Sequence, residues 1–118
     1  MDELKNFVTR KSVRQKINGY LFNPNNYEGW MKGQWFIRAL GFDPKELEQF
    51  KMLEEQIKFN PNEAVYSRDT KWGVRYKQKL TIIGPNGKMV KDIRSHWQID
   101  TESGVVTLVT LLPPKKNR

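Results

Sequence analysis

Residues Trp72–Asp100 constrain the fold more than any other segment, because their pattern predicts one β-hairpin with an apolar face and a basic face. The tetrapeptide Gly84-Pro85-Asn86-Gly87 is typical of a tight reversal between two strands. Apolar and polar residues alternate on both sides of it, which places the two kinds on opposite sides of a sheet. The apolar set is Trp72, Val74, Tyr76, Leu80, Ile82, Met89, Ile93, Trp97 and Ile99. The polar set is Arg75, Lys77, Lys79, Thr81, Asp92, Arg94, His96, Gln98 and Asp100.

The turn also predicts which residues face each other across this hairpin. Closure between Ile83 and Lys88 gives three pairs on the polar side, which are Lys79–Asp92, Lys77–Arg94 and Arg75–His96. With this register both apolar sets fall on one side of the sheet, whereas a one-residue slip would separate them. The hairpin therefore predicts one packed face and one face of cations with a single imidazole.

Composition limits the kind of partner and of site. The 118 residues carry a formal net charge of +8 and a pI near 9.8, which favours an anionic partner, nucleic acid first, over a merely basic surface. Without cysteine and with one histidine the chain has no disulfide, thiolate or His-rich metal site, so we expect no metal and no cofactor. We expect no membrane contact either, because no apolar run is long enough to span a bilayer. The N-terminus has no signal-peptide core, although the segment could belong to a larger secreted protein.

The remaining segments complete an α+β pattern. Helical spacing predicts helices at Ser12–Phe22 and Tyr27–Leu40, and a third that starts at the cap Asp43-Pro44-Lys45-Glu46 and ends before residue 60. Alternation predicts strands at Glu63–Arg68 and Val105–Leu112 on either side of the hairpin.

We therefore expect one domain, residues 1–118, in which three N-terminal helices pack on one face of a four-stranded antiparallel sheet. Residues 1–11 would be loosely ordered, 12–59 would form the helical part, 63–113 the sheet and 114–118 a basic tail. The helices would cover the apolar face and leave the basic face open.

That basic face is the first candidate site. Arg75, Lys77, Lys79 and Arg94 are spaced so that they can follow a phosphate backbone, and arginine can bind one phosphate through two parallel hydrogen bonds. His96 lies among them, and their charges should lower its pKa and favour the neutral imidazole, a base. Attack of a ribose 2′-hydroxyl on the adjacent phosphorus needs such a base, cations and an acid, and no metal. The alternatives are a solvated strand face and a surface histidine without a task.

Three other polar residues are candidates for the same chemistry. A hydroxyl of Thr107 or Thr110 could bond a phosphate, although strict alternation places the two on opposite sides of the last strand unless it contains a bulge. Lys32 lies among aromatic residues and could reach the sheet edge, or it could be an amphipathic surface residue.

The layout of three helices and a four-stranded sheet in a basic, cysteine-free chain resembles the metal-independent RNase toxins of the barnase/EndoU/colicin/RelE-like superfamily. A closer resemblance is to a bacterial family of uncharacterised toxin-like domains, domain of unknown function 6883. It rests on Tyr20-Leu21-Phe22-Asn23-Pro24 with Met31-Lys32-Gly33-Gln34-Trp35-Phe36 and Leu40-Gly41-Phe42, on Tyr76 with Gly84-Pro85-Asn86-Gly87, and on Arg94-Ser95-His96-Trp97 with Leu108-Val109-Thr110 and Pro113.

This resemblance implies Lys32, Tyr76, Arg94, Trp97 and Thr110 as family-like positions. It does not imply His96, where the family has an apolar residue; without His96, lysine, arginine and tyrosine would handle proton transfer, as they do in RelE-like enzymes. It also implies a domain at the C-terminus of a large secreted or contact-dependent toxin, neutralised by a cognate immunity protein that is often acidic.

Our hypothesis from the sequence is a metal-independent, monomeric RNase toxin domain that cleaves tRNA or rRNA by 2′-hydroxyl attack in the cytoplasm of a target cell. The candidate catalytic residues are His96, Arg94, Lys32, Thr110 and Tyr76, and the candidate RNA-binding residues are Arg75, Lys77 and Lys79. The alternatives are a non-catalytic nucleic-acid-binding module and a protein-interaction domain with an acidic partner.

Overall fold

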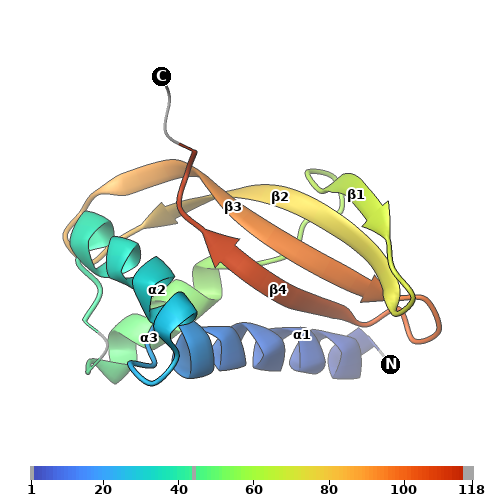
Figure 1. Ribbon diagram of the computed structural model, residues 1–118, viewed down its shortest axis with the longest axis horizontal. Helices are drawn as coiled ribbons and strands as arrows, with labels where there is room; N and C mark the ends of the chain where they lie inside the picture. Colours follow the sequence, from blue (N-terminus) through green and yellow to red (C-terminus); the bar gives the residue numbers. More distant parts are fainter. Residues whose placement is uncertain (1, 44, 116–118) are drawn as a thin grey trace.

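A computed structural model describes residues 2–43 and 45–115, which form an α+β fold with one four-stranded antiparallel sheet (Figure 1). The helical elements are α1 (Asp2–Lys16), the π-helix η1 (Ile17–Leu21), α2 (Tyr27–Leu40) and α3 (Leu47–Gln56). The strands are β1 (Val65–Asp69), β2 (Gly73–Ile83), β3 (Met89–Asp100) and β4 (Val106–Leu112), in the spatial order β1-β2-β3-β4. The predicted fold class and the antiparallel sheet are confirmed.

The ends of the helices differ from the sequence-based bounds in two places. α1 begins at Asp2, and at Ile17 it gives way to the π-helix, where Phe22 N donates to Ile17 O at 2.9 Å. α3 begins at Leu47, because Asp43 caps a turn before it: the side chain of Asp43 accepts from Lys45 N at 2.9 Å. The predicted α2 is confirmed, with Asn26 as its N-cap and Gly41 at φ 79° after its last residue.

Two expectations fall partly outside the described residues. Residues 1–11 were predicted to be loosely ordered. Residue 1 is not described, and the side chains of residues 2–8 are not described, so this stays a prediction. Of the predicted basic tail, residues 116–118 lie outside the described range, and Lys115 is exposed.

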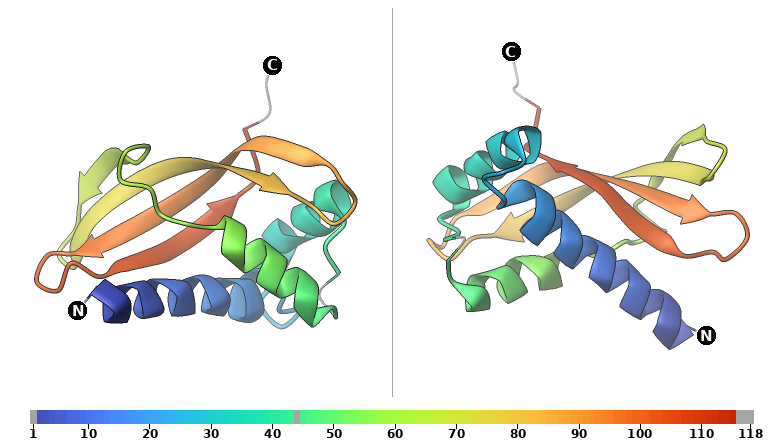
Figure 2. Two further views of the ribbon diagram at one scale, coloured as in Figure 1. Left: turned by 180° about the vertical axis from the view of Figure 1, so that it is seen from behind. Right: turned by 60° about the horizontal axis from the view of Figure 1, so that its bottom comes forward.

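One core lies between the helices and the apolar face of the sheet (Figure 2). Its fully buried residues include Trp97, Phe36, Phe42, Ile17, Leu21, Leu53, Ile82 and Leu108. In α1, Ser12 Oγ accepts from Leu108 N of β4 at 3.1 Å, which ties the middle of that helix to the sheet. The polar groups inside the core are satisfied: Trp97 Nε1 donates to Ser95 Oγ at 2.8 Å, and Ser95 Oγ donates to Gln78 O at 2.6 Å.

The register of the hairpin differs from the predicted one by two residues. β2 and β3 close at Ile83–Met89 instead of Ile83–Lys88, and a bulge at Asp92 (φ 64°) adds a second residue. The pairs on the polar side are therefore Lys79–Arg94, Lys77–His96 and Arg75–Gln98. A shift of two residues preserves the side on which each side chain lies, because the side-chain period of a strand is two. The predicted partners were wrong. The predicted side is confirmed for Arg75, Lys77, Lys79, Arg94 and His96, whereas Trp72 and Met89 of the predicted apolar face are exposed.

A second bulge changes the outer side of β4. Thr107 pairs with Gln98 and Thr110 pairs with His96, while the register shifts between His96 and Trp97. Thr107 and Thr110 are three positions apart, so in a regular strand their side chains would lie on opposite sides. The extra residue places both threonines on the side of the sheet that carries His96.

Candidate functional site

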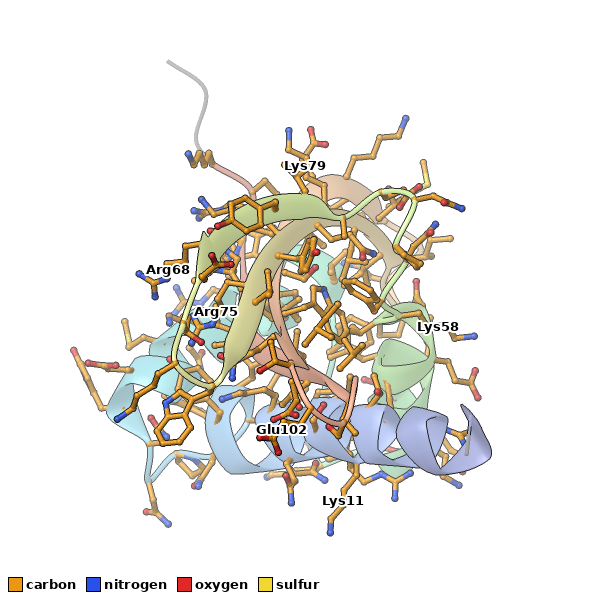
Figure 3. All side chains as sticks on the ribbon, turned by 90° about the vertical axis from the view of Figure 1, so that its right-hand side faces the viewer. Lys11, Lys58, Arg68, Arg75, Lys79 and Glu102 are labelled. Carbon is orange, nitrogen blue, oxygen red and sulfur yellow. The ribbon has the colours of Figure 1, made fainter. Side chains whose placement is uncertain are left out.

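The outer side of β2 and β3 carries a surface that we call the basic face, formed by Arg75, Lys77, Lys79, Arg94 and His96. Figure 3 shows Arg75 and Lys79 pointing outward from the sheet, away from the helical side on which Lys11 and Lys58 lie. These five residues alternate with Gln78, Leu80, Ser95 and Trp97, which are buried on the inner side. The structure therefore brings together all five of the strand residues that the sequence placed on one open surface.

An open groove of about 1340 Å³ runs over this surface. Its basic lining residues are Lys77, Lys79, Lys91, Arg94, His96 and Lys115, and its acidic ones are Glu63 and Asp92. The two ion pairs within residues 2–43 and 45–115 are Arg14–Glu54 and Lys51–Glu48, and both join helical residues. The positive charge of the groove is thus not neutralised within the described part of the chain, which favours an anionic occupant.

Hydrogen bonds fix the two arginines of the basic face. Arg75 Nε donates to Gln98 Oε1 at 3.1 Å, and Arg94 Nε donates to Pro113 O at 2.8 Å. Both contacts use Nε, and in the part of the chain described by the structure no further bond holds either guanidinium. The Nη ends of two oriented forks are therefore available for a phosphate, the geometry in which arginine binds oxyanions most strongly.

The pKa of His96 is lowered from its ordinary value of 6.5, mainly by burial and then by the charges of Lys77, Arg94, Arg75 and Lys32. Burial and neighbouring cations both penalise the imidazolium ion, so the neutral ring prevails at pH 7. The charge of Lys32, which lies on α2, makes a smaller contribution to the same lowering. The sequence-based expectation for the direction of this pKa, and for Arg75 and Arg94 as part of its cause, is confirmed.

Thr110 lies directly across from His96 on β4. Among the described residues, its Oγ1 is the buried side-chain polar atom that has no hydrogen-bond partner. A buried hydroxyl without a partner is uncommon and costs about 1–3 kcal/mol relative to a bonded one. Because Thr110 pairs with His96, which lines the groove, this hydroxyl is a candidate donor to an oxyanion bound there.

Tyr76 is the sequence-predicted site residue that the structure does not bring to this surface. It pairs with Trp97 and lies on the inner side, where its ring centroid is 6.2 Å from that of Phe59 and 6.3 Å from that of Tyr66. Its alternation with Arg75 and Lys77 already indicated the inner side in the sequence. Tyr76 therefore belongs to the inner face of the sheet.

Tyr20 is a residue of the site that reasoning from the sequence did not single out. Lys32 Nζ donates to Tyr20 Oη at 2.8 Å, so the phenol lies beside a lysine that also acts on His96. In the sequence Tyr20 has the spacing of a core residue, and no local pattern indicated the π-helix that carries it. π-Helical turns are rare in proteins, and those that do occur are often found at functional sites.

The described residues show neither a cluster of metal-ligating side chains nor a helix that could span a membrane. Within residues 2–43 and 45–115, no three His, Cys, Asp or Glu side chains come together as a metal site would require. In the same residues no helix combines the length and the apolar character that a bilayer-spanning helix needs.

Comparison with known proteins gives a family and a similarity of fold to solved structures. The sequence profile of a family described as a domain of unknown function (DUF6883) matches residues 3–115. No curated protein sequence matches the chain. A solved structure described as a contact-dependent growth inhibition toxin–immunity protein complex from Klebsiella pneumoniae 342 contains a chain with a similar fold, at a TM-score of 0.66 and 16% identity. The match covers 86% of this chain and 91% of that one.

Proposed function

This chain belongs to the DUF6883 family, and on that premise we propose that it is a toxin domain that cleaves RNA in a target cell. The observation that carries the proposal is the basic face, where cations without acidic partners surround a histidine held neutral at pH 7. A surface of this kind can bind a polyanion, and the neutral imidazole adds a base to it.

The charge of the chain favours the toxin over the immunity role in a complex of the kind that the fold neighbour represents. A net charge of +8 suits a domain that binds RNA, whereas a protein that blocks such a surface must complement it with acidic groups. We therefore propose a cognate, acidic immunity protein as the partner. By the same resemblance, the domain acts in the target-cell cytoplasm after delivery within a larger secreted protein.

In the proposed reaction, His96 accepts the proton of a ribose 2′-hydroxyl while the 2′-oxygen forms a bond to the adjacent phosphorus. The bond from phosphorus to the 5′-oxygen breaks, and the ammonium group of Lys32 donates a proton to the leaving oxygen. Arg75 and Arg94 bind the phosphoryl oxygens as their negative charge grows, and the Thr110 hydroxyl donates to one of them. The products are a 2′,3′-cyclic phosphate and a 5′-hydroxyl, and no metal ion takes part.

Total tRNA and rRNA incubated with the protein in EDTA test this proposal. We expect discrete fragments that end in a cyclic phosphate. Intact RNA that shifts on a gel, with binding that weakens steeply as salt rises, would instead identify a non-catalytic nucleic-acid-binding module. Feeble RNA binding at physiological salt would leave the third hypothesis, a protein-interaction domain with an acidic partner.

A further inference from the structure

Three side chains from α1, η1 and α2 meet at Tyr20. The Nζ atoms of Lys16 and Lys32 each lie 5.2 Å from the centroid of the Tyr20 ring, and Lys32 Nζ also donates to the phenol oxygen. We call Lys16, Tyr20 and Lys32 the edge cluster. It contains two cations and a hydroxyl, and in the described residues neither lysine has an acidic partner.

Close packing of two helices creates this cluster. A Cβ at Gly29 or at Gly33 would collide with the carbonyl oxygens of Tyr20 and Leu21, so only glycine lets α2 approach η1 so closely. Lys32 lies between these two positions and is thereby brought to the phenol of Tyr20. The arrangement holds two like charges together at a cost, because both burial and the charge of Lys32 lower the pKa of Lys16.

The edge cluster lies beside β4, which joins it to the strands of the basic face. Lys16, Tyr20 and Asn26 line a cavity of about 330 Å³ together with Thr107 of β4. Thr107 pairs with Gln98, whose side chain accepts the bond from Arg75. Lys32 links the two sites from the other direction, because its charge acts both on Lys16 and on His96.

We propose that Lys16, Tyr20 and Lys32 form a phosphate-binding subsite at the β4 edge, which holds an RNA phosphate next to the one that is cleaved. This inference rests on the proposed RNase function. Tyr20 Oη accepts its hydrogen bond from Lys32, which leaves the phenolic proton to donate to a phosphate oxygen. The negative charge of a bound phosphodiester would reduce the repulsion between the two ammonium groups, which the described residues leave uncompensated.

Titration of the intact domain with a fluorescein-labelled 2′-O-methyl oligouridine tests the subsite. This probe lacks the attacking hydroxyl, so fluorescence anisotropy measures binding without cleavage, and the titration is repeated at several NaCl concentrations. We expect Lys16→Gln to weaken binding several-fold and to reduce the slope of log K against log salt by about 0.7, the value for one phosphate contact to a single strand. Tyr20→Phe should weaken binding and leave the slope unchanged, because it removes a neutral donor and keeps the packed ring.

Lys11→Gln is the matched control, because it removes the same charge from an exposed position of α1 on the helical side of the molecule (Figure 3). Equal affinities and slopes for Lys16→Gln and Lys11→Gln would overturn the subsite. Thermal unfolding checks that each variant is folded. Should Lys16→Gln fail to fold, Tyr20→Phe decides alone, and an affinity equal to that of the wild type overturns the proposal.

The cleavage and binding assays together distinguish failure of the subsite from failure of the proposed function. Uncleaved RNA in the EDTA assay, together with weaker probe binding by both variants, would refute the RNase and leave a phosphate site on a binding module. Cleaved RNA with unchanged probe binding would refute the subsite and leave the RNase.

Discussion

The two faces of the sheet differ in how far their polar groups are hydrogen-bonded. On the inner face, Gln78 donates to Lys58 O at 2.9 Å and accepts from Asn60 N at 2.8 Å, and Ser95 bonds both Gln78 O and the indole of Trp97. On the outer face, the hydroxyl of Thr110 has no partner in the described residues. The polar groups named on the inner face are hydrogen-bonded, whereas on the outer face the Thr110 hydroxyl and the Nη ends of Arg75 and Arg94 have no partner in the described residues.

This difference separates stability from function along adjacent residues of one strand. Ser95 and Trp97 belong to the folded core, and His96 between them contributes to a surface whose charges repel each other. A protein keeps unsatisfied groups and like charges together where a ligand completes them. Substitutions on the inner face should therefore reduce stability, and those on the outer face should reduce activity.

The largest expected effect is that of His96→Ala on cleavage. Removal of a general base should lower the rate about 10²- to 10⁴-fold while the midpoint of thermal unfolding stays nearly constant. Met89→Ala, at an exposed position of β3 outside the basic face, is the control. Cleavage by His96→Ala at the wild-type rate would contradict the role of His96 and transfer proton abstraction to Lys32, as the family pattern implies.

Arg94→Ala should follow, with a loss of about 10²- to 10³-fold in cleavage because one donor to the phosphoryl oxygens is removed. Expression of this variant without the immunity protein should no longer arrest growth. Arg38→Ala, at an exposed arginine of α2, controls for loss of charge. A fully toxic Arg94→Ala would refute the site assignment.

Substitution of one glutamine on each face compares their contributions to stability directly. Gln78→Ala removes a buried side chain that bonds Lys58 O and Asn60 N in the loop after α3, and should lower the free energy of unfolding by about 1–3 kcal/mol. Gln98→Ala removes one bond to Arg75 at a half-buried position and should cost about 1 kcal/mol or less. Urea unfolding of both variants measures the difference, and equal losses would show that the two faces do not differ.

Thr110→Val tests the unpartnered hydroxyl with a side chain of similar shape. Because the buried oxygen has no partner to lose, stability should stay within about 1 kcal/mol of the wild type or rise. Cleavage should fall by about tenfold, the equivalent of one net hydrogen bond. Thr101→Val, at an exposed position of the turn between β3 and β4, is the control. A large loss of stability in Thr110→Val would show that this hydroxyl has a structural role.

The smallest expected effect is a shift in the titration of His96, the single histidine, whose imidazole protons are therefore unambiguous in NMR spectra. Its midpoint should lie below pH 6.5, because burial and nearby cations lower the pKa. Lys77→Gln should move the midpoint upward, and Lys79→Gln should move it less, since Lys77 is a source of the shift and Lys79 is not. Because the unfolded state binds a proton more readily than the folded one, this histidine should reduce stability as the pH falls below 6.5. A midpoint at or above 6.5 would contradict the proposed neutral base.

Much of the fold followed from local patterns. The Gly84–Gly87 turn, the alternation in β2 and β3, and the capped helix α2 all lie where the sequence predicted them. The cross-strand partners did not, because the bulge at Asp92 leaves no periodic signal and depends on how the strand bends over the core. The start of α3 was also misplaced, since the same Asp-Pro signal can cap a turn or a helix.

The sequence alone determined which side chains share the basic face, since the two-residue period of a strand survives any even shift of register. Only the tertiary structure decided which residues of other elements lie beside the basic face. The bulge in β4 brings Thr107 and Thr110 to one side, and the close approach of α2 to η1 places Lys16, Tyr20 and Lys32 together. These contacts link residues far apart in the chain, and their geometry is set by packing, which local periodicity does not encode.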